Sequence, residues 1–145
     1  MIALEQARQS LELLGLTQAA AVLESRLEGA ARHGPTYAEF LADLLDAELQ
    51  VRRERYLKAR LRLAHLPFHK TLQDFDFSFQ PSIDERQIRE LATLAFVAEA
   101  ANVLFLGPPG VGKTHLAVAL AVEAIHQGIG AYFVSARQLV ADLRR

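Results

Sequence analysis

The sequence predicts a mixed α/β fold, with three helices in the N-terminal half and a strand, a glycine-rich loop and a helix in the C-terminal half. Three observations lead to this prediction. Apolar residues recur at helical spacing from residue 2 to residue 66. Short continuous apolar runs at residues 103–106 and 131–134 are typical of buried strands. Directly after the first run, residues 107–112 are all glycine, proline or valine, which predicts a loop.

The N-terminal half is expected to form three helices. The first covers residues 2–14 and the second residues 17–32, and each is followed by a glycine that can end a helix. Thr36 and Glu39 have the spacing of a capping box, which opens a third helix that continues to the next proline. We therefore expect residues 1–67 to form a helical N-terminal domain.

Residues 68–82 are the expected linker between two domains. Aromatic side chains alternate with polar ones here, at Phe75, Phe77 and Phe79. This is the period of a short strand or of an extended segment with one buried edge. The C-terminal domain is then expected over residues 83–145.

The C-terminal domain is expected to open with a helix that runs from a second capping box, Ser82 and Glu85, towards Ala100. The first strand and the glycine-rich loop follow. The next helix, over residues 114–127, is apolar nearly all round, so we expect it to be buried on more than one side. The second strand and a helix that begins after Ser135 follow it. Two strands joined by a helix predict the start of a parallel sheet.

The glycine-rich loop fits the pattern G-x-x-x-x-G-K-[ST], in which backbone N–H groups and a lysine bind phosphate groups. Lys113 would then bridge the β- and γ-phosphates of a nucleotide, and Thr114 would place its hydroxyl on Mg²⁺. His115 joins the candidate site through its place at the start of the helix, not through its imidazole. The alternative is a glycine turn with an incidental lysine. The candidate nucleotide-binding residues are Gly107, Pro108, Pro109, Gly110, Val111, Gly112, Lys113, Thr114 and His115.

The net charge of −1 is distributed unevenly along the chain. Residues 1–47 hold seven acids and three bases (−4), residues 48–70 two acids and seven bases (+5), and residues 71–145 eight acids and six bases (−2). Two interpretations of the basic block stay open. It is a solvated helix whose arginines pair with the acidic first two helices, or it contacts the phosphate backbone of DNA. Its basic helical residues are Arg52, Arg53, Arg55, Lys58, Arg60 and Arg62.

Composition narrows the remaining functional classes. The chain has no cysteine, which excludes disulfides and thiolate metal sites, and its five histidines lack metal-ligand spacing. No apolar run approaches the length of a membrane span, and the charged N-terminus is unlike a signal peptide. We therefore expect a soluble, cytoplasmic protein.

The stretch LFLGPPGVGKTHLAVALAVEA, with the aromatic linker before it and YFVSARQLVADL after it, resembles the IstB family. These are AAA+ ATPases that insertion sequences encode as helpers of the transposase, and DnaC-type helicase loaders are their relatives. The resemblance implies that the loop binds ATP and Mg²⁺. It also implies DNA as a partner, together with the transposase or further copies of the chain. The implied fold is an N-terminal three-helix domain followed by a P-loop AAA+ domain.

The chain departs from the family pattern after the loop. Family members continue into a Walker B strand, a sensor residue and an arginine finger, whereas the only acids after Thr114 are Glu123 and Asp142, both in helical stretches. We therefore expect a chain truncated after the Walker A region. It would carry an incomplete AAA+ domain without its later strands, and it would bind ATP without hydrolysing it alone. Three alternatives stay open: a helicase loader in DNA replication, a non-enzymatic fragment that binds DNA or a partner, and a decayed remnant.

Overall fold

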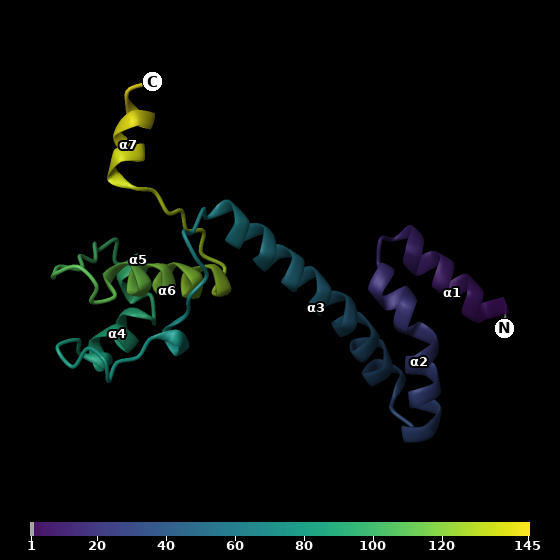
Figure 1. The fold of residues 1–145 in the computed structure, drawn as a ribbon. Helices are drawn as coiled ribbons and strands as arrows, with labels where there is room; N and C mark the ends of the chain where they lie inside the picture. Colours follow the sequence, from purple (N-terminus) through teal and green to yellow (C-terminus); the bar gives the residue numbers. More distant parts are fainter. Residues whose placement is uncertain (1) are drawn as a thin grey trace. The chain divides into compact units, whose positions relative to one another are not determined.

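The computed structural model describes residues 2–145 and divides into two compact units, with the boundary between Tyr56 and Leu57. Within these residues all the regular secondary structure is helical (Figure 1). The helices are α1 (Ile2–Leu13), α2 (Thr17–His33), α3 (Tyr37–Leu63), the short 3-10 helix η1 (Leu72–Asp74), α4 (Glu85–Leu91), α5 (Ala95–Ala98), α6 (Lys113–His126) and α7 (Ala136–Leu143).

In the first unit, helices α1 and α2 form a helical hairpin, and the beginning of α3 packs against it. Helices α1 and α2 lie side by side (Figure 1), and their shared core contains Ala19, Leu23 and Leu44. Half-buried apolar side chains complete this core: Leu4, Leu11, Leu16, Val22 and Phe40. The three predicted N-terminal helices are thus confirmed, because the apolar spacing seen in the sequence is the spacing of the packed faces.

The capping box predicted before α3 is also confirmed. The backbone N–H of Thr36 donates to Glu39 Oε2 at 2.7 Å, and the N–H of Glu39 donates to Thr36 Oγ1 at 3.2 Å. These bonds satisfy two of the amides that every helix start leaves without a partner.

The first backbone amides of α2 are also capped, by a buried carboxylate that is distant in the sequence. Glu48, on α3, is only 3% exposed and accepts hydrogen bonds at Oε2 from the N–H groups of Gln18 (2.8 Å) and Ala19 (3.0 Å). Its other oxygen accepts from Arg52 Nε at 3.3 Å. The bond from Ala19 is the largest cause that lowers the pKa of Glu48, so the charged form is held in place.

Helix α6 is the centre of the second unit (Figure 1). The burial predicted from its apolar composition is confirmed, since half of its length is buried: Leu116, Val118, Ala119, Leu120, Val122, Ala124 and Ile125. Ala64, Ile88 and Leu94 are the other buried apolar residues of this unit.

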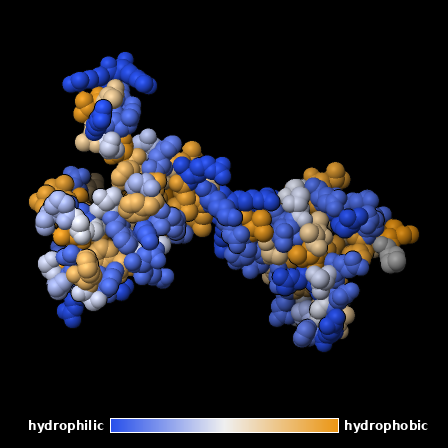
Figure 2. All heavy atoms as spheres, viewed as in Figure 1, coloured by the Kyte–Doolittle hydropathy of each residue, from blue (hydrophilic) through white to orange (hydrophobic). Residues whose placement is uncertain are grey.

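The predicted α/β fold, with its P-loop domain built on a parallel sheet, is wrong for residues 2–145, which contain no strand and no sheet. A strand needs a neighbour for its backbone N–H and C=O groups, and neither predicted strand has one. In residues 103–106, the side chains of Leu104 and Leu106 are 81% and 90% exposed. Figure 2 shows hydrophobic atoms at the surface of the second unit, to which these residues belong. In residues 131–134, the N–H of Phe133 donates instead to the carbonyl of Ala64 at 2.7 Å.

The helix predicted from the capping box at Ser82 towards Ala100 is interrupted. Leu94 adopts a left-handed conformation (φ 63°) between α4 and α5, while its side chain is only 4% exposed. The left-handed backbone costs about 1–2 kcal/mol, and burying a leucine returns about 1.5–3 kcal/mol. The capping box predicted at Ser82 is also wrong, because Asp84 caps α4 by accepting from the N–H of Arg86 at 2.9 Å.

The aromatic segment before α4 is not a strand. It contains η1 and a series of turns, and a capping box that the prediction missed lies at its start. Thr71 donates from its N–H to Asp74 Oδ2 at 2.8 Å and from its hydroxyl at 3.0 Å. These bonds, the backbone bond first, lower the pKa of Asp74.

Candidate functional site

The glycine-rich loop precedes the first residue of α6, as the motif requires. Gly110 (φ 80°) and Gly112 (φ 96°) both adopt backbone angles that favour glycine, and Gly112 is the residue from which α6 begins. Pro108 and Pro109 are exposed. The chain thus forms a glycine loop that leads into a helix N-terminus, although no strand supports it.

The ammonium group of Lys113 binds its own loop. Its Nζ donates to the carbonyl of Gly107 and to the carbonyl of Pro108, each at 2.6 Å. The lysine that the motif assigns to phosphate therefore points at the loop backbone, where it has two neutral acceptors.

The loop amides, in contrast, have no acceptor. Within residues 2–145 the N–H groups of Gly110, Val111 and Gly112 donate neither to a backbone carbonyl nor to a side chain. The first amides of an α-helix also lack an intrahelical partner. These donors and the adjacent ammonium are a donor set that suits an anion with several oxygens. The residues present therefore fit a polyphosphate.

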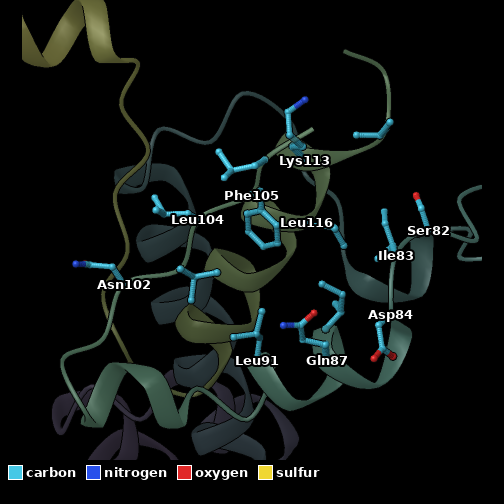
Figure 3. A pocket seen from close by; sticks show the side chains of 14 residues that line it. Ser82, Ile83, Asp84, Gln87, Leu91, Asn102, Leu104, Phe105, Lys113 and Leu116 are labelled. Carbon is cyan, nitrogen blue, oxygen red and sulfur yellow. The ribbon is translucent and has the colours of Figure 1, made fainter. Parts of the chain in front are cut away.

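A cavity of about 420 Å³ lies beside the loop, and both apolar and polar residues line it. Figure 3 shows the ring of Phe105 pointing into this cavity towards Gln87 and Leu91, whereas the nitrogen of Lys113 points away from it. Its lining residues come from the loop, from α4 and α6, from the residues just before α4 and from residues 102–106. They are Ser82, Ile83, Asp84, Gln87, Ile88, Leu91, Asn102, Val103, Leu104, Phe105, Leu106, Val111, Lys113 and Leu116.

His115 and the aromatic segment support the loop from another direction. The Nε2 atom of His115 lies 3.1 Å from the carbonyl oxygen of Thr71, and its ring meets the ring of Phe75 edge-on with centroids 5.0 Å apart. A Cβ atom at Gly112 would lie 2.5 Å from Phe75 Cε2, so the ring is packed directly on the glycine. The imidazole is thus a packing and hydrogen-bonding group at this position.

The sequence prediction did not place Thr71 or Phe75 at the loop. The alternation of aromatic residues is the available signal, but it predicts only a short strand or an extended segment with one buried edge. Thr114, the predicted Mg²⁺ ligand, is exposed on the first turn of α6. Within residues 2–145, no group of three or more His, Asp or Glu side chains is arranged to hold a metal ion.

The basic residues of α3 do not all have the same environment. Arg52 pairs with Glu48 on its own helix (3.3 Å) and donates to the carbonyl of Gly15 at 3.2 Å, so it belongs to the first unit's packing. Like Arg52, the other basic residues of the helix are exposed: Arg53, Arg55, Lys58, Arg60 and Arg62. No helix in residues 2–145 combines the length and the apolar character that a membrane crossing requires.

A glycine loop with free amides, a lysine and a following helix are the elements from which phosphate-binding loops of nucleotide-binding proteins are built. A model of the family described as IstB-like ATP binding protein matches residues 7–145. The chain belongs to this family of ATP-binding proteins.

The relatives are named as ATP-binding proteins of insertion sequences. The chain is 50% identical to that of IS5376 from Geobacillus stearothermophilus over 118 residues, which are 81% of this chain and 47% of the relative. It is 50% identical to that of IS21 from Pseudomonas aeruginosa over 123 residues, 85% of this chain and 46% of the relative. It is 33% identical to the ATP-binding protein of IS232 from Bacillus thuringiensis over 141 residues, which are 97% of this chain and 56% of the relative. The chain spans about half the length of these relatives.

Proposed function

We propose that this chain binds ATP at residues 107–114, with Lys113 on the phosphate groups and the hydroxyl of Thr114 as a ligand of Mg²⁺. The observation that carries the proposal is the set of loop amides without an acceptor, next to an ammonium group at the start of α6. Membership of an ATP-binding family supports it. Magnesium bound with the nucleotide would neutralise part of the phosphate charge.

Binding of ATP requires the ammonium group of Lys113 to leave the two backbone carbonyls that now accept its hydrogen bonds. Its ammonium now donates to the carbonyls of Gly107 and Pro108, and it would donate to phosphate oxygens instead. Charge-assisted bonds between two ionised groups are roughly twice as strong as bonds between neutral groups, so a polyanion competes well with two carbonyls. His115 stays with Thr71 and keeps α6 in place beneath the loop.

Titration calorimetry of the full chain with Mg·ATP tests this proposal. Lys113→Ala should weaken ATP binding at least about tenfold, because a hydrogen bond to a charged group contributes about 1.5–3 kcal/mol. Lys70→Ala is the matched control: it removes the same charge from an exposed lysine of the same unit and should leave the affinity unchanged. Equal ATP affinity of Lys113→Ala and wild type would refute the proposal.

By extension from the relatives, we propose that the chain acts in the cytoplasm as an ATP-binding helper of an insertion-sequence transposase. The proposal is supported by the relatives, which are named as ATP-binding proteins of insertion sequences. A tagged chain should retain the transposase of its own insertion sequence from a mixture of the two purified proteins. Absence of retention at micromolar concentrations, with ATP present, would count against the role.

We also propose that the exposed basic residues of α3 bind the DNA backbone. Arg53, Arg55 and Lys58 are exposed and take part in no ion pair within residues 2–145. Lysine and arginine side chains that neutralise phosphates release counterions, so the affinity falls with salt in proportion to the number of contacts. Arg52 is left out of this set because it is bound to Glu48.

The salt dependence of binding to a duplex oligonucleotide tests the DNA proposal. Replacing Arg53, Arg55 and Lys58 by glutamine should reduce the slope of log K against log salt by up to about 2.7, at about 0.9 per contact. Glutamine at Arg86, Arg137 and Arg144 makes the same change in net charge outside α3. If both triple variants reduce the slope equally, the charge of the chain and not this helix governs binding.

A further inference from the structure

A network of hydrogen bonds connects η1 to the first turn of α6. His115 lies on that turn, and its Nε2 atom is 3.1 Å from the carbonyl oxygen of Thr71, a residue 44 positions earlier in the sequence. A carbonyl oxygen can only accept, so Nε2 carries the hydrogen of this bond. The bond therefore ties a distant segment to the helix start that carries the free loop amides and Lys113.

Asp74 holds the carbonyl of Thr71 in place. Its N–H donates to this same carbonyl oxygen at 3.2 Å, while its Oδ2 atom accepts from the N–H (2.8 Å) and from the hydroxyl (3.0 Å) of Thr71. A carbonyl oxygen has two lone pairs, so it can accept from Asp74 and from His115 at the same time. Asp74 is exposed and does not line the cavity beside the loop, so its connection to the loop is indirect.

The segment that contains η1 also contacts the loop itself. The ring of Phe75, which directly follows η1, meets the ring of His115 edge-on, with 5.0 Å between the centroids. The same ring fills the space beside Gly112, where a Cβ atom would lie 2.5 Å from Phe75 Cε2. The segment thus touches the start of α6 at two points, on either side of the two residues assigned to phosphate and Mg²⁺. Donors that are already held in their binding geometry lose less entropy when a ligand binds.

We propose that Thr71, Asp74 and His115 form a positioning network that sets the affinity of the glycine-rich loop for phosphate groups. The inference rests on the proposed binding of ATP by this loop. His115 acts through its Nε2–H group, and Asp74 acts through Thr71 without contact to the nucleotide. Because the network acts on the phosphate donors, it affects ATP and a polyphosphate without a nucleoside equally.

Two substitutions at His115 separate the hydrogen bond from the ring. His115→Phe retains an aromatic edge for Phe75 but has no N–H group, whereas His115→Gln retains an N–H donor without the ring. Calorimetry of the full chain with Mg·ATP should show binding about 2- to 12-fold weaker in His115→Phe, which corresponds to one lost hydrogen bond. His115→Gln should stay within about twofold of wild type. His126→Phe is the matched control and should bind as wild type does, because this histidine is exposed in the last turn of the same helix.

A double-mutant cycle tests whether Asp74 acts through His115. Asp74→Ala removes the carboxylate that holds Thr71, and it should weaken binding of Mg·ATP and of Mg·tripolyphosphate equally, again about 2- to 12-fold. In the His115→Phe background the Thr71 carbonyl has lost its donor on α6, so Asp74→Ala should then have no further effect. Additive losses would mean two independent effects and would overturn the network.

Three other results would overturn the positioning role. They are unchanged ATP affinity in His115→Phe, an equal loss in His115→Gln, and a loss for ATP without a loss for tripolyphosphate. The last result would mean that the network contacts the nucleoside and does not act on the loop. Far-ultraviolet circular dichroism of each variant confirms that the helices are intact.

Failure of the underlying ATP proposal has a different signature, because the wild-type chain would then bind neither ligand. The amide resonances of Gly110 and Gly112 in the ligand-free chain test the positioning role separately. They should be sharp in wild type and in His115→Gln, and broadened by exchange in His115→Phe and in Asp74→Ala. Sharp resonances in all four chains would refute the positioning role.

Discussion

Gly112 is the position where the loop geometry can be tested most directly. Alanine at this residue has two separate costs. The first is the backbone angle (φ 96°), which an alanine adopts at a cost of about 1–2 kcal/mol. The second is the new Cβ atom, which would lie 2.5 Å from Phe75 Cε2 and must displace a ring that already touches two others. Overpacking of this kind costs about 1–3 kcal/mol.

Gly110→Ala isolates the first cost. Its backbone angle is similar (φ 80°), but a Cβ atom there would meet nothing within 4 Å. A less flexible unfolded chain returns about 0.4–1 kcal/mol in both variants. We therefore expect Gly110→Ala to lower the free energy of unfolding by about 1 kcal/mol and Gly112→Ala by about 2–4 kcal/mol.

Urea unfolding followed by circular dichroism measures both variants, and a double-mutant cycle completes the test. Phe75→Ala removes the obstructing ring, so the additional cost of Gly112→Ala should disappear in the Phe75→Ala background. Equal losses for the two glycine variants, or no coupling between Gly112 and Phe75, would refute the proposed contact.

Two further predictions concern the cores of the two units. Glu48→Gln should lower the melting temperature most near neutral pH: the depressed pKa of Glu48 means that its charge stabilises the fold above the unfolded pKa, and this contribution is lost as pH falls below about 4. A difference between wild type and variant that persists in acid would show that the charge is irrelevant. Leu116→Ala should cost about 2–5 kcal/mol in urea unfolding, because its side chain is 2% exposed, whereas Leu139→Ala, at 46% exposed, should stay within about 0.5 kcal/mol. Similar losses for the two leucines would contradict the assignment of α6 as the core.

The features that the sequence predicted correctly are local. The bonds between Thr36 and Glu39 span three residues, and the burial of α6 follows from apolar residues around its whole circumference. Each depends on neighbours within a turn or two of helix, so the pattern contains the information. The glycines of the loop are also a local feature, and Gly110 and Gly112 both adopt positive φ angles in the structure.

The features that were missed or wrong depend on distant partners. The apolar run at residues 103–106 predicts a strand, but a strand exists only where a second segment supplies its hydrogen bonds. Glu48 caps a helix that begins about thirty residues earlier in the sequence, and no local pattern around Glu48 or around the start of α2 predicts this contact. The packing of Phe75 on Gly112 is likewise a long-range contact, and the alternation of aromatic residues in the sequence contains no information about it.

The residue between α4 and α5 shows how two requirements at one position limit which amino acids can occupy it. Glycine or asparagine at residue 94 would relax the main chain, but either would leave the space beneath it unfilled or polar. Isoleucine or valine would fill that space, but a β-branched residue fits this conformation least well. Leucine at residue 94 is thus a compromise, and substitutions there should be tolerated only when a neighbour that lines the same space changes with it.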